Sequence, residues 1–153
     1  MATIDQMKEV LKKQLDAFSK GDWKSYRETL SERSVYEEEA TGRRVTGPDE
    51  IVRTVEPWLK GFPDCVGRIK DAIGSGDAIV AELEWTGTHK GALSGPFGTI
   101  PATNKQVRVP AVLVLRFEGD SSDRLAQIKS LVEGRLAAIM AEMGAPPPKI
   151  AAH

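Results

Sequence analysis

The chain has 153 residues and a formal net charge of −1, from 21 Lys and Arg residues against 22 Asp and Glu residues. This length matches one globular domain, and the balanced charge gives no broad electrostatic field for nucleic acid or an anionic membrane. The single cysteine, Cys65, excludes an internal disulfide, and no apolar run reaches the length of a membrane span. Because the first residues also lack the basic and apolar regions of a signal peptide, we expect a soluble, cytoplasmic protein.

Histidine is scarce in this sequence, which contains only His89 and His153. A histidine-based catalytic triad or metal site therefore has almost no residues to draw on, and we expect no metal. Carboxylates are left as the acid–base groups.

Three stretches place apolar residues at helical spacing, and they cover residues 4–18, 23–30 and 48–61. Asp5 is positioned to cap the first helix and Gly21 to end it, while Asp22 has the position of a second N-cap. Pro48 suits the first turn of the third helix, which we expect to stop at Gly61.

The remaining pattern is extended. It predicts a short strand and four long ones, over residues 34–39, 65–73, 78–89, 106–118 and 124–132. Alternate positions from Ile79 to Trp85 share one apolar face. Pro110, Val112 and Val114 make the second face of their strand apolar too, which predicts helices against one face and a second subunit or a cavity against the other.

This order of elements predicts an α+β fold, in which a curved antiparallel sheet wraps around the N-terminal helices as a cone-shaped barrel. The open end of such a cone is a natural pocket for a small molecule. We expect one domain over residues 1–144, with a last short helix at 136–143, followed by a flexible tail over 145–153 that is rich in Pro and Ala.

Several short motifs follow one another along the chain. They are Gly21-Asp22-Trp23, Val35-Tyr36-Glu37, Thr41-Gly42-Arg43, Phe62-Pro63-Asp64, Ser75-Gly76-Asp77, the run from Trp85 to Gly91, and Ile100-Pro101-Ala102-Thr103. In this order and spacing they resemble the SnoaL-like (polyketide cyclase-like) branch of the nuclear transport factor 2-like superfamily. The resemblance implies a deep apolar pocket, a homodimer through the sheet and no cofactor. It leaves the reaction open, because the superfamily includes both enzymes and non-catalytic binders.

One departure from the family concerns the end of the last strand. Cyclase-type members carry an acid–base carboxylate there, whereas this chain reads Leu131-Val132-Glu133-Gly134-Arg135. Either Glu133 replaces that carboxylate with a small shift of register, or the usual chemistry is lost or has moved. The other interpretation of Glu133 is an exposed residue that enters the last helix.

Three consecutive glutamates lie in the first strand, and Glu37 and Glu39 should share one face while Glu38 points oppositely. A carboxylate that faces an apolar cavity has a raised pKa and can move a proton next to a carbonyl. Glu37 is the first choice, because relatives often have a pocket-facing His at its place. The alternative is a solvated acidic edge that pairs with Arg43 and Arg44.

His89 lies in a turn at the end of a strand, where it can donate a proton or hydrogen-bond a substrate oxygen. The alternative is a histidine packed on a loop at the rim. Six aromatic residues are candidates for the substrate pocket: Trp23, Tyr26, Trp58, Phe62, Trp85 and Phe97. Of these, Trp58 and Phe62 are the first choices, and Trp85 is closer to a core residue.

Our hypothesis is a cofactor-independent cyclase or isomerase that acts on a hydrophobic, polyketide- or terpenoid-like small molecule. Glu37 would be the acid–base group, assisted by Glu39, His89 or Glu133. The alternative is a non-catalytic module of the same fold that binds a small ligand or dimerises.

Overall fold

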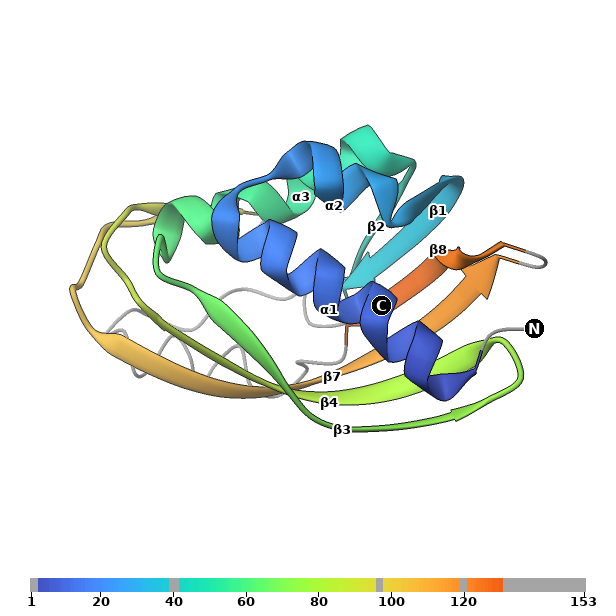
Figure 1. Cartoon of the computed structure of the whole chain (residues 1–153). Coiled ribbons are helices and arrows are strands. Elements are labelled where there is room, and N and C mark those ends of the chain that lie inside the picture. Colours follow the sequence, from blue (N-terminus) through green and yellow to red (C-terminus); the bar gives the residue numbers. More distant parts are fainter. Residues whose placement is uncertain (1–2, 39–41, 96–97, 119–120, 131–153) are drawn as a thin grey trace.

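The computed structural model describes residues 3–38, 42–95, 98–118 and 121–130 (Figure 1). Glu39, Phe97 and Glu133 lie outside these ranges, as do the expected last helix and the tail.

Three helices form where the periodicity predicts them: α1 (Ile4–Lys20), α2 (Trp23–Glu28) and α3 (Pro48–Gly61). The predicted cap of α1 was wrong, because Thr3 and not Asp5 caps it. The Thr3 hydroxyl accepts from the backbone N–H of Gln6, and the Gln6 side chain accepts from the backbone N–H of Thr3. Asp5 instead lies in the first turn, where its negative charge interacts favourably with the positive end of the helix dipole. Gly21 ends α1 with a φ of 68°, as predicted.

Six strands form the main sheet. They are β1 (Leu30–Glu38), β2 (Arg43–Thr46), β3 (Val66–Ser75), β4 (Ala78–Thr88), β7 (Gln106–Glu118) and β8 (Ser121–Ser130), in the order β2-β1-β8-β7-β4-β3. All neighbours are antiparallel except β1 and β8, which run parallel. A separate two-stranded sheet pairs β5 (Leu93–Gly95) with β6 (Gly98–Ile100). The sequence pattern predicts no strand at β2, β5 or β6, because these strands are short and rich in glycine or charge.

The helices lie on the concave face of the sheet (Figure 1). Ile79, Ala81 and Leu83 of β4 are buried there, as their alternation predicted, and Met7 and Leu11 of α1 are buried in the same core. Each such Leu, Ile or Met side chain stabilises the fold by about 1.5–3 kcal/mol when it leaves water. The concave side therefore holds both the core and any interior site.

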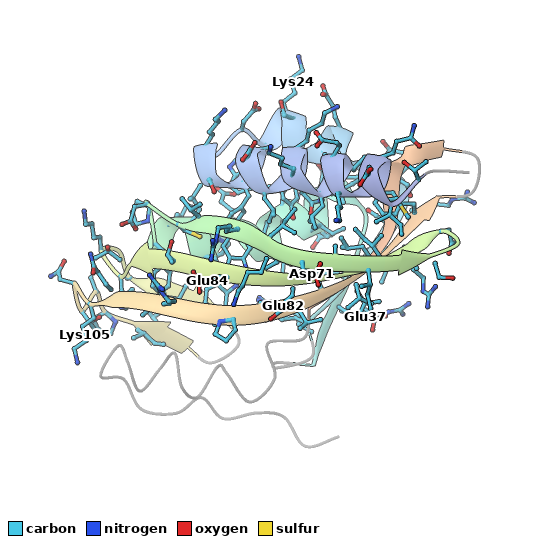
Figure 2. All side chains as sticks on the ribbon, turned by 60° about the horizontal axis from the view of Figure 1, so that its bottom comes forward. Lys24, Glu37, Asp71, Glu82, Glu84 and Lys105 are labelled. Atoms are coloured by element: carbon cyan, nitrogen blue, oxygen red, sulfur yellow. The ribbon has the colours of Figure 1, made fainter. Side chains whose placement is uncertain are left out.

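The convex face of the sheet is mixed in character. Glu82 and Glu84 project from it (Figure 2), and the Glu84 carboxylate lies 3.4 Å from the Arg68 guanidinium and 4.0 Å from that of Arg108. Three large apolar side chains of the described part of this sheet are open to water: Ile73 is 67% exposed, Val66 is 52% exposed and Val80 is 38% exposed.

Within the part of the chain that the structure describes, no helix is both long enough and apolar enough to cross a bilayer.

Candidate functional site

The inner face of β1 carries an unusual run of polar residues. Ser34, Tyr36 and Glu38 are all buried, whereas Val35 and Glu37 between them are only partly buried. Strand side chains alternate between the two faces, so these three share the concave side with the core. The carboxylate inside the protein is therefore that of Glu38.

Glu37 and Glu38 point to opposite faces of β1, as predicted, but the inward-facing carboxylate is that of Glu38 and not that of Glu37, the first choice. Glu37 lies on the convex side (Figure 2), where its carboxylate is 3.4 Å from the Arg44 guanidinium and its side chain is 23% exposed. This is the ion-paired arrangement given above as the alternative for Glu37. The signal that could have found Glu38 is Tyr36, because a large aromatic ring is expected to face the core and position 38 shares its face.

Arg43 on β2 holds the Glu38 carboxylate. The two residues are opposite each other in the antiparallel pair, and one terminal guanidinium nitrogen lies 3.1 Å from Oε1 and 3.2 Å from Oε2. Glu38 is only 4% exposed. A carboxylate buried this deeply costs several kcal/mol if it is left without a cation, so Arg43 is what permits Glu38 to face inward.

Tyr36 completes this group. Its hydroxyl donates a hydrogen bond to Glu38 Oε2 at 3.4 Å. Burial raises the pKa of Tyr36 well above its ordinary value, and the negative charge of Glu38 raises it further while the positive charge of Arg43 opposes this. Burial also raises the pKa of Tyr26 on α2. Both phenols therefore stay protonated, and Tyr36 is a hydrogen-bond donor beside the buried carboxylate.

His89 is also buried, but at a different place. Its backbone N–H donates to the carbonyl of Lys105, just before β7, while Glu38 is aligned through β8 with Leu113. Positions 105 and 113 are eight residue steps apart, which is about 26 Å along an extended strand. The structure therefore does not bring His89 together with Glu38.

The surroundings of the His89 ring are neutral. The ring stacks on Phe62 with centroids 5.2 Å apart, and Nδ1 lies 3.0 Å from the Thr103 hydroxyl. Burial lowers the pKa of His89, with a smaller opposing effect from the backbone of Gly91. His89 thus matches the alternative of a packed histidine in a loop, and its proposed catalytic role stays a prediction.

Aromatic rings form a chain from the sheet to α2. Trp85 meets Phe18 edge to face at 5.5 Å, Phe18 meets Trp23 at 5.8 Å, and Trp23 meets Tyr26 at 5.6 Å. Trp85 packs against the core, as expected. Trp58 is also partly buried against the core and Phe62 is buried, so their role in lining a pocket stays a prediction.

Among the described residues, no group of three or more His, Cys, Asp or Glu side chains is arranged to hold a metal ion. Burial raises the pKa of the Cys65 thiol to about 12, which disfavours the reactive thiolate form.

The model of one protein family, SnoaL-like polyketide cyclase, matches residues 8–131. The chain belongs to the SnoaL-like polyketide cyclase family. This agrees with the resemblance seen in the sequence motifs and with the helix-lined antiparallel sheet. No curated protein matches the chain.

Solved structures show the same fold at low sequence identity. A SnoaL-like polyketide cyclase-type protein from Jannaschia sp. CCS1 has a TM-score of 0.78 and 20% identity, over 96% of this chain and 99% of that one. AclR from Streptomyces galilaeus has a TM-score of 0.75 and 21% identity, over 93% of this chain and 83% of that one. A protein from Catenulispora acidiphila with a ketosteroid isomerase-like fold, in complex with trimethylamine, has a TM-score of 0.73 and 19% identity, over 91% and 95%.

Proposed function

We propose that this family member is a cofactor-independent enzyme of the cyclase or isomerase type that moves a proton on a hydrophobic small molecule. The observation that carries the proposal is the Glu38 carboxylate, buried on the inner face of β1 between the Tyr36 hydroxyl and the Arg43 guanidinium. The names of its relatives, a polyketide cyclase family and a ketosteroid isomerase-like fold, support this class of reaction. Glu38 takes the acid–base role that the sequence had suggested for Glu37.

The chemistry needs one base and one hydrogen-bond donor. Glu38 removes a proton from a carbon next to a carbonyl, and the electron pair of that C–H bond moves toward the carbonyl oxygen. Tyr36, which stays protonated, is the donor: its O–H, which points to Glu38 Oε2 at 3.4 Å, turns from that oxygen to the substrate carbonyl oxygen when the substrate is bound. Return of the proton to another atom gives an isomer, while attack of the new carbanion on a second carbonyl closes a ring. Such general base catalysis is worth about 10²- to 10⁴-fold in rate.

The substrate class follows from the surroundings of Glu38. Leu113 of β7 and Ala81 of β4 are aligned with it across the sheet, and both are buried apolar residues. The aromatic chain that includes Trp23 and Tyr26 adds flat apolar surface on the helical side. This setting suits a polyketide- or terpenoid-like molecule better than a charged one.

Deuterium exchange into a simple ketone tests the acid–base role and does not require the natural substrate. The probe is 2-tetralone, an apolar bicyclic ketone, in D₂O, with loss of its C1 proton signal followed by NMR. We expect Glu38→Gln to lower the enzyme-catalysed exchange rate by about 10²-fold or more. Glu37→Gln is the matched control and should exchange like the unaltered protein. Equal exchange by Glu38→Gln would falsify the assignment.

The same assay tests the remaining sequence candidates. Glu39→Gln and Glu133→Gln concern carboxylates outside the described residues, and His89→Gln tests the buried histidine. A large loss of exchange rate in Glu133→Gln with no loss in Glu38→Gln would assign the reaction to the end of the last strand.

A second candidate function is a non-catalytic module that binds a small apolar ligand. It is favoured by the Arg43 contact, because a carboxylate already neutralised by a guanidinium has a sufficient structural reason to be buried. Binding of 2-naphthol, which mimics the enol of 2-tetralone, together with no deuterium exchange in the unaltered protein would support this function.

We also propose a homodimer through the convex face of the sheet. Ile73, Val80 and Val114 are aligned in one row across β3, β4 and β7, beside Val112 and Pro110 on the same side of β7. Val80→Asp should shift the mass measured by light scattering from a dimer toward the 16.7 kDa monomer. Val66→Asp, at an exposed position near the start of β3, is the control. A monomeric unaltered protein at micromolar concentration would refute the dimer.

A further inference from the structure

We propose that Ser34 is a specificity-determining residue, whose hydroxyl hydrogen-bonds a ligand oxygen at the end of the ligand that is remote from Glu38. The inference rests on the proposed function only in assuming that the ligand occupies the interior beside Glu38.

The starting observation is an unsatisfied hydroxyl. Ser34 is fully buried, and its Oγ has no hydrogen-bond partner among residues 3–38, 42–95, 98–118 and 121–130. Its backbone is engaged in the sheet edge, with the Ser34 carbonyl accepting from the Gly47 N–H at 2.8 Å. Buried side-chain hydroxyls in proteins almost always have a partner, so this one requires an explanation.

The other buried serine and threonine hydroxyls of the described chain show what ordinary structural hydroxyls do here. Ser31 Oγ accepts from the Arg33 N–H at 3.2 Å, and Thr54 donates to the Glu50 carbonyl at 2.9 Å. Thr29 both donates to the Tyr26 carbonyl at 2.6 Å and accepts from the Gln14 amide at 2.9 Å. Each is satisfied by a nearby group, and Ser34 alone of these residues is not.

The position of Ser34 points to a ligand. It lies on the same face of β1 as Tyr36 and Glu38, so the three side chains form one line along the strand. Ser34 and Glu38 are about 13 Å apart along an extended chain, and the Tyr36 ring lies between them. A flat ring system with one oxygen near Glu38 and a second at its far end fits this order of polar, apolar and polar groups.

A buried water is the competing occupant. A stably bound water makes two to four hydrogen bonds to polar groups, which it then satisfies permanently. A hydroxyl satisfied in this way is part of the fold, and its removal would cost stability. A hydroxyl kept for a ligand costs stability while the site is empty, and its removal would cost only affinity.

Two probes that differ by one hydroxyl separate these cases: 2-naphthol and 2,6-dihydroxynaphthalene, with binding measured by equilibrium dialysis. In the unaltered protein we expect the second hydroxyl to tighten binding by about 5- to 10-fold, as one additional hydrogen bond would. In Ser34→Ala this gain should disappear, while the affinity for 2-naphthol itself stays the same.

Ser31→Ala is the matched control, since it removes a buried hydroxyl of the same strand that already has a partner. It should lower Tm slightly and keep the gain from the second hydroxyl. Ser34→Ala should leave Tm unchanged or raise it. Retention of the full gain by Ser34→Ala, or a fall in Tm like that of Ser31→Ala, overturns the proposal.

The outcomes distinguish this inference from the proposed function. If Glu38→Gln still catalyses exchange but Ser34→Ala loses the gain, the acid–base assignment fails and the ligand contact stands. If Glu38→Gln loses exchange but Ser34→Ala keeps the gain in affinity from the second hydroxyl, the acid–base assignment stands and the Ser34 contact fails. Failure of the unaltered protein to bind either naphthol at millimolar concentration overturns the Ser34 contact as well.

Discussion

The region around Glu38 and the region around His89 each bury a titratable side chain, but they do so in opposite ways. Glu38 is held as half of an ion pair by Arg43, with a phenol that cannot easily lose its proton beside it. His89 is held by an aromatic ring and a threonine hydroxyl, and burial lowers its pKa. The Glu38 region holds an ion pair inside the protein, whereas the His89 ring is surrounded by uncharged groups; the proton transfer that we propose therefore uses the first region.

The His89 region makes backbone hydrogen bonds to the end of α3 and to the loop before β7. The backbone N–H groups of Lys90 and Gly91 both donate to the Gly61 carbonyl at the end of α3, and Asn104 N–H donates to the His89 carbonyl. A Cβ placed on Gly91 would collide with the Lys60 carbonyl oxygen, so the chain passes α3 as closely as a backbone can. The segment from His89 to Gly91 therefore joins the loop before β7 to the end of α3, with Lys90 and Gly91 bonded to the helix and His89 to Asn104.

The largest effect should come from removing the cation of the Glu38 region. Arg43→Met leaves a buried carboxylate without its partner, and we expect the free energy of unfolding to fall by about 3–5 kcal/mol. Urea denaturation measures this directly. The double variant Glu38→Leu/Arg43→Met removes both charges and should recover most of the loss. A single variant as stable as the unaltered protein would show that the pair does not hold Glu38.

The sequence predicts the three helices and the four long strands because their apolar residues repeat with clear periods of 3.6 and 2. It does not settle which glutamate is inside, because residues 34–38 read Ser-Val-Tyr-Glu-Glu, with an apolar or aromatic residue on each face. The partner that decides the matter, Arg43, belongs to β2, a strand of four residues with no apolar alternation. The site thus depends on a pairing between strands that no local pattern encodes.

The second-largest effect that we expect is a loss of stability at low pH, caused by His89. Because burial lowers the pKa of His89 below its ordinary value near 6.5, the unfolded chain binds a proton in a range where the folded protein does not. Stability is therefore complete above pH 6.5 and falls as the pH drops from 6.5 to the lowered pKa. Thermal unfolding at pH 7.5 and at pH 5 should show this fall.

His89→Gln is the control for that experiment, since glutamine does not titrate and can still bond to Thr103. The difference in Tm between the two pH values should shrink in this variant. The lowered pKa values of Asp22 and Asp64 cannot imitate the effect, because those groups cost stability only as the pH falls through and below about 3.8. An equal pH response in His89→Gln would place the titrating group elsewhere.

The smallest effect should come from Glu37, the neighbour of Glu38 on the opposite face. Its partner Arg44 is 67% exposed, and ion pairs open to water contribute only about 0–1 kcal/mol. Glu37→Gln should therefore change the free energy of unfolding by about 0.5 kcal/mol or less in urea denaturation. Glu38→Gln leaves the Arg43 guanidinium, itself 23% exposed, without its carboxylate and should cost clearly more. Equal costs at the two positions would mean that both carboxylates meet water, and the case for a reactive carboxylate inside the sheet would then be lost.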